Sequence, residues 1–436
     1  CIRDSDYIYQ NHGTLAWLYK PTLFWFDSSD FALQAVTVIG CIVSLLLFFG
    51  IKPFWSLIVL FVLYLSLLHA GQVFLMFQWD TLLLEAGFLA IFLTGGLSHL
   101  LLFMFHYLLF RLRFMSGVSK ITSGDPSWAN LTTLNYYFET QPLPHAGAWY
   151  FHQLPEWILQ GGVLLVFFTE LIVPFFIFLP RKFRLSAATI TIVMQLIIIA
   201  TSNHNWINLL TIVLCLFLLD DDIMKKILPG WLCHYLSGER NVSAGGRMAK
   251  SNFMLPVFAF MILASSMIAF TSMVSNIQLP DVLKKTTAIV RLWGIGHIFH
   301  VFPNMQVERH ELQLEGSDDG VEWRAYTFKY KPAALDEKPA FIIPHQPRLD
   351  WMIWFVPPRP VNMEYWFDRF VTKVHHGSPE VLGLLEKNPF PDKPPRYIRV
   401  QVYQYWFTSI DERAESGRWW RREYLGQFPY VRPRHP

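Results

Sequence analysis

The sequence predicts a polytopic α-helical membrane domain of about eight spans, followed by a luminal, mainly β domain of sandwich-like type. Two observations lead to this fold class. Hydrophobic residues make up 53% of the 436 positions and charged residues only 16%, whereas soluble domains carry about 25% charged residues. Long apolar runs fill the region 31–276, while the region 281–436 is polar, rich in Pro and Trp, and alternating in pattern.

The membrane domain is predicted from runs of mostly apolar residues, because a spanning helix needs about 20 of them. The candidate spans are about 31–50, 53–73, 79–94, 97–114, 157–180, 185–203, 205–219 and 252–276. The third and the seventh are short, so each has a re-entrant helix as its alternative.

Basic residues in the loops predict the orientation, since cytosolic loops carry an excess of Lys and Arg. With alternate crossings, the "RKFR" loop 181–184 and the loop 220–251 fall in the cytosol. The segment 1–30, the loop 115–156 and the domain 281–436 then share the luminal side. The same pattern fits the endoplasmic reticulum membrane or, as the alternative, a bacterial inner membrane.

Two short features extend this topology. Asn130 lies in "NLT", a glycosylation acceptor that would face the lumen, whereas Asn241 in "NVS" would face the cytosol and stay unmodified. Residue 1 is a cysteine rather than a methionine, so we expect a further segment upstream, such as a signal or a first span.

Several function classes find no support in the sequence. The four cysteines form no C-x-x-C pair, so neither a zinc site nor a thiol-disulfide site is predicted. No G-x-S-x-G elbow, Gly-rich phosphate loop or H-E-x-x-H motif occurs. A net charge of +3, scattered along the chain, gives no argument for a nucleic-acid partner. We therefore predict no metal and no cofactor.

Lys120 stands out because it ends an apolar run, in "FMSGVSKITSGDPSW", among small residues. Ionisable residues at membrane depth are costly and usually face a cavity or a partner. We therefore expect Lys120 to face protein, within reach of a carboxylate such as Asp80, Glu85 or Asp125. The small neighbours would let another helix approach closely. The alternative is a lysine that marks the interface and reaches to the headgroups.

A second group of polar residues, "TSNHNWINLL", falls at the break between two predicted spans. By the predicted topology this break lies near the same luminal surface as the lysine and its candidate carboxylates. We expect these groups to gather into one polar site. The candidate binding residues of this site are Trp79, Trp128, His204 and Asn205. Each also has a structural alternative, since a histidine between two asparagines is common in turns.

The C-terminal region reads as short strands. "HELQLEGSDDGVEWRAYTFKY" predicts a strand, an Asp-Gly turn and a second strand. Further strands are expected at 340–344, 351–356 and 397–408, and a helix at about 364–374. The tryptophans of this region are expected mostly in its core. The aromatic-rich loop 135–157 is expected to lie along the membrane surface.

Several blocks of this sequence resemble the lipase maturation factor family, in order, over most of the chain. These are "GQVFLMFQWDTLLLEAGFLAIFL", "LLFRLRFMSGVSKITSGDPSWANLTTLNYYFETQPLP", "NHNWINLLTIVLCLFLLDD", "EGSDDGVEWRAYTFKYKP", "PHQPRLDWMIWF" and "YWFTS" with "GRWWRREYLG". The resemblance implies a multi-pass glycoprotein of the endoplasmic reticulum membrane that acts as a non-enzymatic chaperone. Its clients would be dimeric, secreted lipases, engaged by the luminal C-terminal domain. Membrane lipids and other folding factors of the reticulum would be its further partners.

The chain departs from the family pattern in two places. At His204 most members carry other residues, and "GIGHIFHVFPNM" differs from the usual entry to the luminal domain. In this family an additional span normally precedes the position of residue 1. These departures leave open which client the protein would serve.

The segment "MSGVSKITSGDPSWANLTTL" is also similar to part of the vitamin K-dependent carboxylases and related membrane domains. In the carboxylase a lysine acts as a base with reduced vitamin K, and the matching position here is Lys120, followed by Trp128. This similarity implies the alternative function, a membrane-embedded enzyme with a luminal-facing polar cavity around Lys120. Its catalytic residues would be Lys120, Asp80 and Glu85, and its ligand a lipid or a quinone-like molecule. A tightly paired Lys120 would favour the chaperone over the enzyme.

Overall fold

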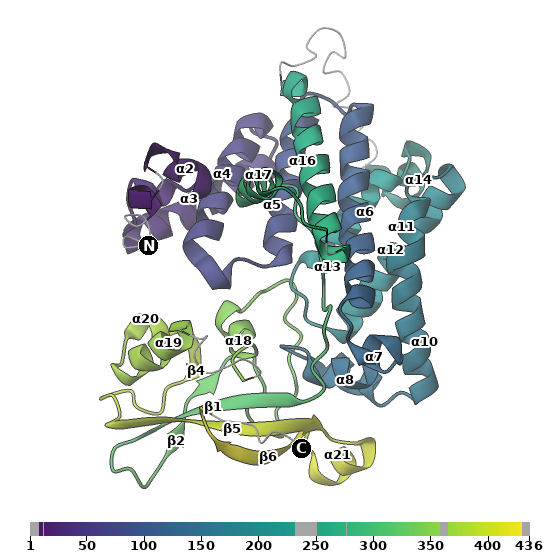
Figure 1. The fold of residues 1–436 in the computed structure, drawn as a ribbon. Helices are drawn as coiled ribbons and strands as arrows, with labels where there is room; N and C mark the ends of the chain where they lie inside the picture. The colour runs from purple at the N-terminus through teal and green to yellow at the C-terminus, as the bar shows by residue number, and fades with distance from the viewer. Residues whose placement is uncertain (1–7, 12, 232–250, 276, 358–364, 430–436) are drawn as a thin grey trace. The chain divides into compact units, whose positions relative to one another are not determined.

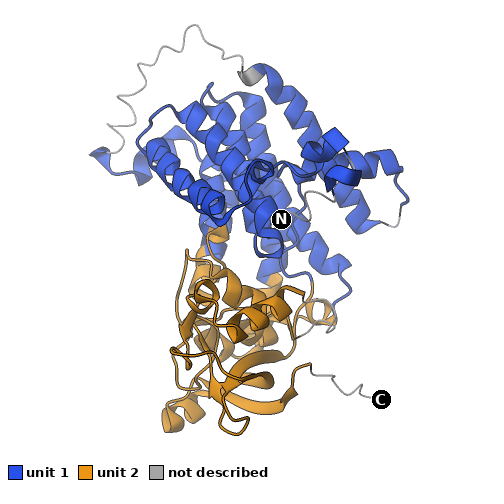
Figure 2. Cartoon of the chain, turned by 90° about the vertical axis from the view of Figure 1, so that its left-hand side faces the viewer, with its two compact units in different colours: residues 1–125, 165–195, 209–303 blue, residues 126–164, 196–208, 304–436 orange. Residues whose placement is uncertain are grey.

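The chain divides into two compact units, which are distinguished in Figure 2. The structure is a computed structural model that describes residues 8–11, 13–231, 251–275, 277–357 and 365–429. Unit 1 comprises residues 1–125, 165–195 and 209–303, and unit 2 comprises residues 126–164, 196–208 and 304–436. Most of the expected cytosolic loop 220–251 lies outside the described residues, as do Asn241 and the first residues of the segment 1–30.

Unit 1 is helical. Among the described residues, six helices are long and apolar enough to cross a membrane: Asp30–Phe48, Pro53–Phe74, His99–Thr122, Glu156–Phe176, Arg181–Thr201 and Phe253–Val274. In Figure 1 they correspond to α3 (Asp30–Phe48), α4 (Pro53–Gly71), α6 (His99–Thr122), α10 (Glu156–Phe167) with α11 (Val173–Phe176), α12 (Arg181–Thr201) and α16 (Ser251–Val274). The predicted multi-span membrane domain is confirmed.

The two candidate spans that looked short form shorter helices. They are α5, Gln78–Leu93, and α13, Ile207–Cys215, which a 3-10 turn extends to Leu218. Polar residues account for both starts. Asp80 lies in the first turn of α5, and the Asn205 side chain accepts from the Ile207 amide at 2.8 Å, just before α13. Such carboxylate and amide oxygens satisfy the free N–H groups of a helix start, so the helices begin there.

Among its described residues, unit 1 also contains α2, Ala16–Tyr19, α14, Asp221–Ile227, and α17, Asp281–Leu292. The α17 helix follows the last long span and is amphipathic. It buries Thr287 and Val290, and it exposes Val282 and Leu283.

Unit 2 contains the β-rich region expected from the sequence. Its main sheet is antiparallel and four-stranded, with the order β2-β1-β5-β6. The strands are β1 (Arg309–Ser317), β2 (Arg324–Ala325), β5 (Tyr397–Phe407) and β6 (Trp420–Gln427), and a separate pair joins β3 (Thr327–Phe328) to β4 (Leu385–Lys387). The predicted hairpin around the Asp-Gly turn is confirmed by the pairing of β1 with β2.

Short helices, rather than a second large sheet, cover this sheet. The main core places α18 (Arg348–Ile353) and α19 (Tyr365–His375) against β1 and β5, as Figure 1 shows. The helix expected at 364–374 is thus confirmed. The strand expected at 351–356 is wrong, since this segment starts in α18, and no strand forms at 340–344. Asp350, in the first turn of α18, accepts from the Tyr330 and Lys331 amides at 2.8 and 3.0 Å, which fixes this helix in the core.

A second core in unit 2 is assembled from distant parts of the chain. The loop after α6 supplies α7 (Pro126–Ala129), α8 (Thr133–Thr140) and α9 (Ala146–His152), and the C-terminal region supplies β5, β6 and α21 (Ile410–Ser416). Phe138 and Trp149 from the loop pack with Phe407, Trp419 and Trp420. The loop expected to lie on the membrane surface therefore contributes to a protein core. Of the C-terminal tryptophans, Trp351, Trp419 and Trp420 are buried, and Trp323, Trp354 and Trp406 are half-buried.

Candidate functional site

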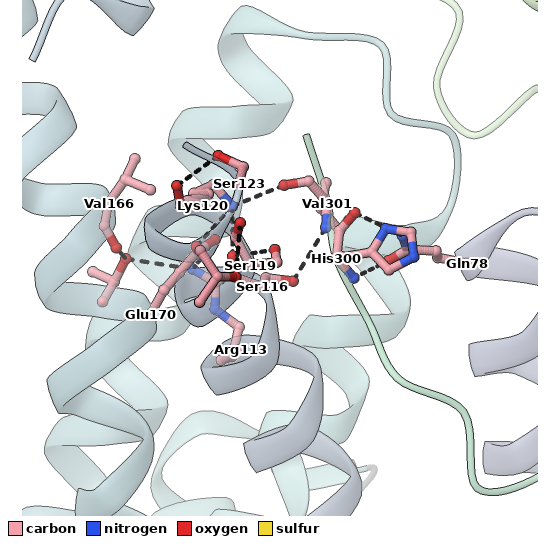
Figure 3. Close-up of polar contacts among 12 residues, drawn as sticks. Gln78, Arg113, Ser116, Ser119, Lys120, Ser123, Val166, Glu170, His300 and Val301 are labelled. Carbon is pink, nitrogen blue, oxygen red and sulfur yellow. Dashed lines mark hydrogen bonds and ion pairs between the residues drawn. The ribbon is translucent and has the colours of Figure 1, made fainter. Parts of the chain in front are cut away.

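Lys120 is buried at the end of α6, where it meets a glutamate from another span (Figure 3). Its ammonium donates to Glu170 Oε2 at 2.8 Å and to the Val301 carbonyl at 2.8 Å. It also donates to the Ser116 carbonyl at 3.3 Å, one turn earlier in α6. The expectation that Lys120 faces protein and a carboxylate is confirmed. The partner differs, since the ion pair is made with Glu170 and not with Asp80, Glu85 or Asp125.

Glu170 faces a second cation. The Arg113 guanidinium lies 3.5 Å from Glu170 Oε1 and donates to Thr169 Oγ1 at 3.4 Å. All three ionic side chains are less than 10% exposed. A buried charge is stable only when it is paired and hydrogen-bonded. Lys120, Arg113 and Glu170 are called the Glu170 cluster below. One carboxylate is shared by two cations, so the cluster carries one positive charge in excess.

Backbone geometry explains why Glu170 reaches this position. Glu170 lies in a π-helical segment, Phe168–Ile172, inserted between α10 and α11. On the facing helix, a Cβ added at Gly117 would lie 2.8 Å from Leu171 Cδ2 and 2.9 Å from Glu170 Cβ. The glycine therefore permits the close approach that the small residues beside Lys120 predicted. One-turn π segments are frequent at functional sites.

Glu85 forms a separate buried pair in unit 1. Its carboxylate pairs with Arg111, and both side chains are fully buried. The second oxygen of Glu85 accepts from the Gly296 amide at 2.9 Å, and Arg111 donates to the His297 carbonyl at 2.9 Å. Gly296 has a φ of 68° and lies so near Ser265 that an added Cβ would be 2.8 Å away. A side chain other than glycine is therefore disfavoured at this position.

Both pairs hold the same stretch of chain, residues 294–301. This stretch also binds α5, because Gln78 donates to the His300 carbonyl at 2.7 Å and accepts from the His300 amide at 2.8 Å (Figure 3). Its sequence, "GIGHIFHV", belongs to the segment expected to differ from the usual entry to the C-terminal domain. The sequence did not predict this role, because no sequence motif indicates that a stretch of backbone is bound by buried side chains.

The contacts of Asp80 and Trp79 include Tyr64 in α4 and Phe77 just before α5. Asp80 accepts from the Tyr64 hydroxyl at 2.7 Å and from the Phe77 amide at 3.3 Å. Trp79 is buried, and its ring stacks on Phe77 at 4.5 Å. Both residues serve the start of α5. Their predicted catalytic and binding roles remain predictions, without support from this geometry.

His204, Asn205 and Trp128 belong to unit 2. The His204 ring hydrogen-bonds the Tyr137 hydroxyl and lies edge-on to Trp351, with ring centroids 6.2 Å apart. Burial lowers the pKa of His204 to about 4, so the ring is neutral. Asn205 adopts a φ of 51° and caps α13, while Trp128 is buried in α7. His204 and Asn205 stabilise the break between α12 and α13, which fits their structural alternative.

Sequence reasoning also missed Arg309, which is fully buried in unit 2. Its guanidinium donates to the carbonyls of Glu139, Gln141 and Pro142 at 2.9, 2.5 and 3.1 Å. It also pairs with Glu311 at 2.5 Å. Because an arginine offers a fixed fork of donors, one side chain can satisfy several carbonyls at once. Arg309 thereby fastens the α8 segment to β1.

No metal site is found in the part of the chain that the structure describes, where no three His, Cys, Asp or Glu side chains form a ligand group. The membrane unit contains buried ionic groups. Its buried ionic groups act on each other and on the backbone of residues 294–301.

Comparisons with known proteins agree with this architecture. A family model described as the lipase maturation factor transmembrane domain matches residues 7–226. A second model, described as the lipase maturation factor C-terminal domain, matches residues 296–430. No solved structure matches the chain.

Curated relatives point to the same family. Lipase maturation factor 2 of Xenopus laevis is 32% identical, over 94% of this chain and 74% of the relative. Human lipase maturation factor 2 is 31% identical over the same shares. Lipase maturation factor 1 of the mouse is 32% identical, over 98% of this chain and 79% of the relative. The resemblance noted in the sequence is confirmed, and the chain belongs to the lipase maturation factor family.

Proposed function

We propose that this protein is a multi-pass membrane chaperone that assists the folding and assembly of dimeric, secreted lipases in the endoplasmic reticulum. Its relatives bear the name lipase maturation factor. In this proposal the membrane unit is a scaffold. Unit 2 lies on the luminal side, meets the client and holds its apolar surface until the lipase dimer closes.

The observation that carries the proposal is the pairing of Lys120 with Glu170 at 2.8 Å. A catalytic base needs a free lone pair and access to its substrate. Here the ammonium instead donates to a carboxylate and to two carbonyls, and it is 4% exposed. These contacts favour a structural clasp. The carboxylase-like alternative gains no support from the comparisons, which match lipase maturation factors over both parts of the chain.

Unit 2 offers surface for a client. Aromatic side chains are more than half exposed at several positions of its described part, namely Tyr150, Phe341, Tyr365 and Tyr424. Aromatic residues dominate the energetics of protein interfaces, because they bury much area at little cost in conformational entropy. They are suited to hold apolar client surface.

Secretion of a lipase tests the proposal. Cells that lack endogenous lipase maturation factors would receive this protein together with a dimeric lipase, and the specific activity of the secreted lipase would be measured. We expect a rise of about tenfold or more, since lipase that misfolds is retained or inactive. A monomeric secreted enzyme is the matched control, and its specific activity should not change. Equal specific activity of the dimeric lipase with and without this protein would refute the proposal.

Glycosylation tests the luminal orientation separately. Asn130 is exposed in a turn of unit 2, where an acceptor asparagine is accessible. We expect an endoglycosidase to increase the gel mobility of the protein, and Asn130→Gln to abolish this change. Modification at Asn241 in place of Asn130 would show the opposite orientation.

A further inference from the structure

Unit 2 contains an open pocket between α9 and α21. It has a volume of about 590 Å³ and is lined by Trp149, Tyr150, Gln153, Leu154, Ile410, Arg413, Ala414 and Gly417. All of these residues belong to unit 2. Ligand sites of proteins typically enclose about 300–1,000 Å³, so the volume of this pocket lies within the range of ligand-binding sites. We call it the Trp149 pocket.

The walls of the Trp149 pocket are preorganised. Trp149 is buried, and its indole N–H donates to the Thr408 carbonyl at 2.9 Å. Trp419 meets it edge-on at 5.4 Å between ring centroids. On the other side, α21 is fixed by a capping box of Ser409 with Glu412 and ends at Gly417, whose φ is 70°. A rigid site loses little conformational entropy when it binds a ligand.

Arg413 gives the pocket its charge. Its guanidinium lies 3.6 Å from the ring centroid of Trp419 and 4.8 Å from that of Trp149. Among the described residues, Arg413 forms no ion pair, and the carboxylate of nearby Glu412 is engaged by the Ser409 amide and Arg421. A guanidinium stacked on rings keeps its N–H edge for a carboxylate, which it binds with strong, charge-assisted hydrogen bonds.

Most of the other side chains of the pocket are apolar or aromatic, and two of the large ones are open to solvent. Tyr150 is 56% exposed and Ile410 is 60% exposed. A lipid acyl chain requires an enclosed apolar cavity, whereas an open pocket lets an extended chain enter and leave. Aromatic residues with a central arginine are also the composition of hot spots in protein interfaces. The chemistry therefore fits a polypeptide with an apolar side chain beside a negative charge.

We propose that the Trp149 pocket binds an extended polypeptide segment in which a large apolar side chain stands next to an acidic residue. The apolar side chain packs between Tyr150 and Ile410, and the carboxylate pairs with Arg413. This inference rests on the proposed function, since it supplies the contact by which unit 2 selects a stretch of an unfolded client.

Peptide binding to the full chain in lipid nanodiscs tests this proposal. The probes are two fluorescein-labelled hexapeptides with the central sequences Leu-Phe-Asp and Leu-Phe-Asn, and the readout is fluorescence anisotropy. We expect the aspartate peptide to bind about tenfold more tightly, as a charge-assisted hydrogen bond provides. Arg413→Gln should remove this preference and leave the weaker affinity that both peptides share. Tyr150→Ser should weaken both peptides equally.

Two controls keep the test decisive. Arg396→Gln removes another arginine that lies over an aromatic ring, 5.3 Å from Tyr397, and should leave the preference intact. Arg413→Lys keeps the positive charge, so it should retain part of the preference even if the glutamine variant unfolds. Equal binding of the two peptides to the wild-type protein would overturn the proposal. So would Arg413-dependent binding of labelled oleate without peptide binding, which would indicate a lipid site.

The lipase assay separates this proposal from the proposed function. If Arg413→Gln loses the peptide preference but matures the lipase fully, the client role of the pocket is wrong and the chaperone function stands. If the wild-type protein binds the aspartate peptide but matures no lipase, the pocket stands and the lipase function is wrong. If the variant loses both, both proposals are supported.

Discussion

Glu170 forms ion pairs with two buried cations. The effect of a substitution in the Glu170 cluster therefore depends on which charge it removes. Lys120 and Arg113 both lie within 4 Å of its carboxylate. When Lys120 is removed, Glu170 keeps Arg113. When Glu170 is removed, two like charges remain buried without their shared partner. Substitution of Glu170 should therefore destabilise the protein more than substitution of Lys120, because only the former leaves buried charges without a partner.

We therefore predict that Glu170→Gln destabilises the protein more than Lys120→Met. Loss of the acid should cost about 3–5 kcal/mol, as for other buried pairs with one partner removed, and Lys120→Met should cost less. Thermal unfolding in nanodiscs measures both. The double variant should be more stable than Glu170→Gln alone, because one stranded charge is then gone. A Lys120→Met protein that is as stable as wild type but inactive in lipase maturation would instead indicate a chemical role for Lys120.

Single residues show where sequence reasoning succeeds. The cost of a charge at membrane depth was enough to predict that Lys120 is buried against a carboxylate. Its partner could not be identified, because Glu170 is presented by a π segment that shifts the helical phase of the residues after it. Arg309 was not predicted either, since three of its four partners are backbone carbonyls, which the residue types do not reveal.

At the scale of elements, the close contact of α6 with the π segment depends on Gly117, which has no side chain. Gly117 faces Leu171 and Glu170, and an added Cβ would overlap both. Gly161 in α10 has nothing within 4 Å of such a Cβ. The two helical glycines are therefore a matched pair for measuring what close approach contributes.

We predict that Gly117→Ala destabilises the protein and that Gly161→Ala does not. Overpacking costs about 1–3 kcal/mol, which exceeds the gain of about 0.5–1 kcal/mol from replacing a helical glycine by alanine. The melting temperature of each variant in nanodiscs gives the comparison. Equal effects of the two substitutions would mean that α6 can move away from the π segment without loss.

Glu139 links two elements of unit 2 by a bond that depends on pH. Its carboxylate accepts from the Phe407 amide in β5 at 2.6 Å, and His152 lies 3.9 Å away. Burial raises the pKa of Glu139 from 4.5 to about 7, against the opposing effects of this bond, Arg309 and Arg421. Between these two values the folded state binds more protons than the unfolded state. This group therefore stabilises the fold at low pH, and its contribution is lost as the pH rises through about 7.

We predict that Glu139→Gln removes this component of the pH dependence. The variant should gain stability relative to wild type as the pH rises from about 5 to about 8, since glutamine carries no charge to desolvate. His204, with its pKa lowered to about 4, has the opposite slope between that value and 6.5, so the difference between variant and wild type is the quantity to measure. Parallel stability curves for the two proteins would contradict the assignment.

Elements were predicted best where a pattern is local. The β1 hairpin and α19 follow from alternation and from amphipathic spacing, and both occur. The α18 helix was mistaken for a strand, because its apolar residues "LDWMIWF" form a short run that fits either structure. The helix prevails there because Asp350 is fixed by two backbone amides in its first turn.

At the scale of the whole molecule, the important feature is that unit 2 is built from three stretches of chain, 126–164, 196–208 and 304–436. The sequence predicted a separate, mainly β domain at 281–436. The second core of unit 2, however, includes Phe138 and Trp149 from the loop after α6 and Leu159 from α10. Hydrophobic patterning alone could not show this, because it does not identify which distant segments pack together.

We predict that a fragment of residues 296–436 is less stable than the same region in the full chain. Without the loop, the core around Trp419 and Trp420 loses Phe138 and Trp149, and Arg309 loses three carbonyls. Joining residues 126–164 to this fragment by a flexible linker should restore cooperative unfolding, which near-UV circular dichroism would follow. The control linker carries Phe138→Ser and Trp149→Ser. A cooperative transition of equal midpoint in the fragment alone would show that the loop is dispensable.

Because unit 2 is assembled from three stretches of chain, its folding depends on the order in which these stretches are synthesised. During synthesis, the ribosome completes residues 126–164 long before it reaches β6, the strand that carries Trp420. Domains otherwise tend to fold as units while the chain emerges. Trp149 therefore cannot be packed in this core until the ribosome has made the later helices and the strands that carry Phe407 and Trp420. A premature stop codon between Val274 and Trp420 would thus yield a product with complete membrane helices and an uncovered aromatic core, which is the kind of exposed apolar surface that chaperones and proteases act on.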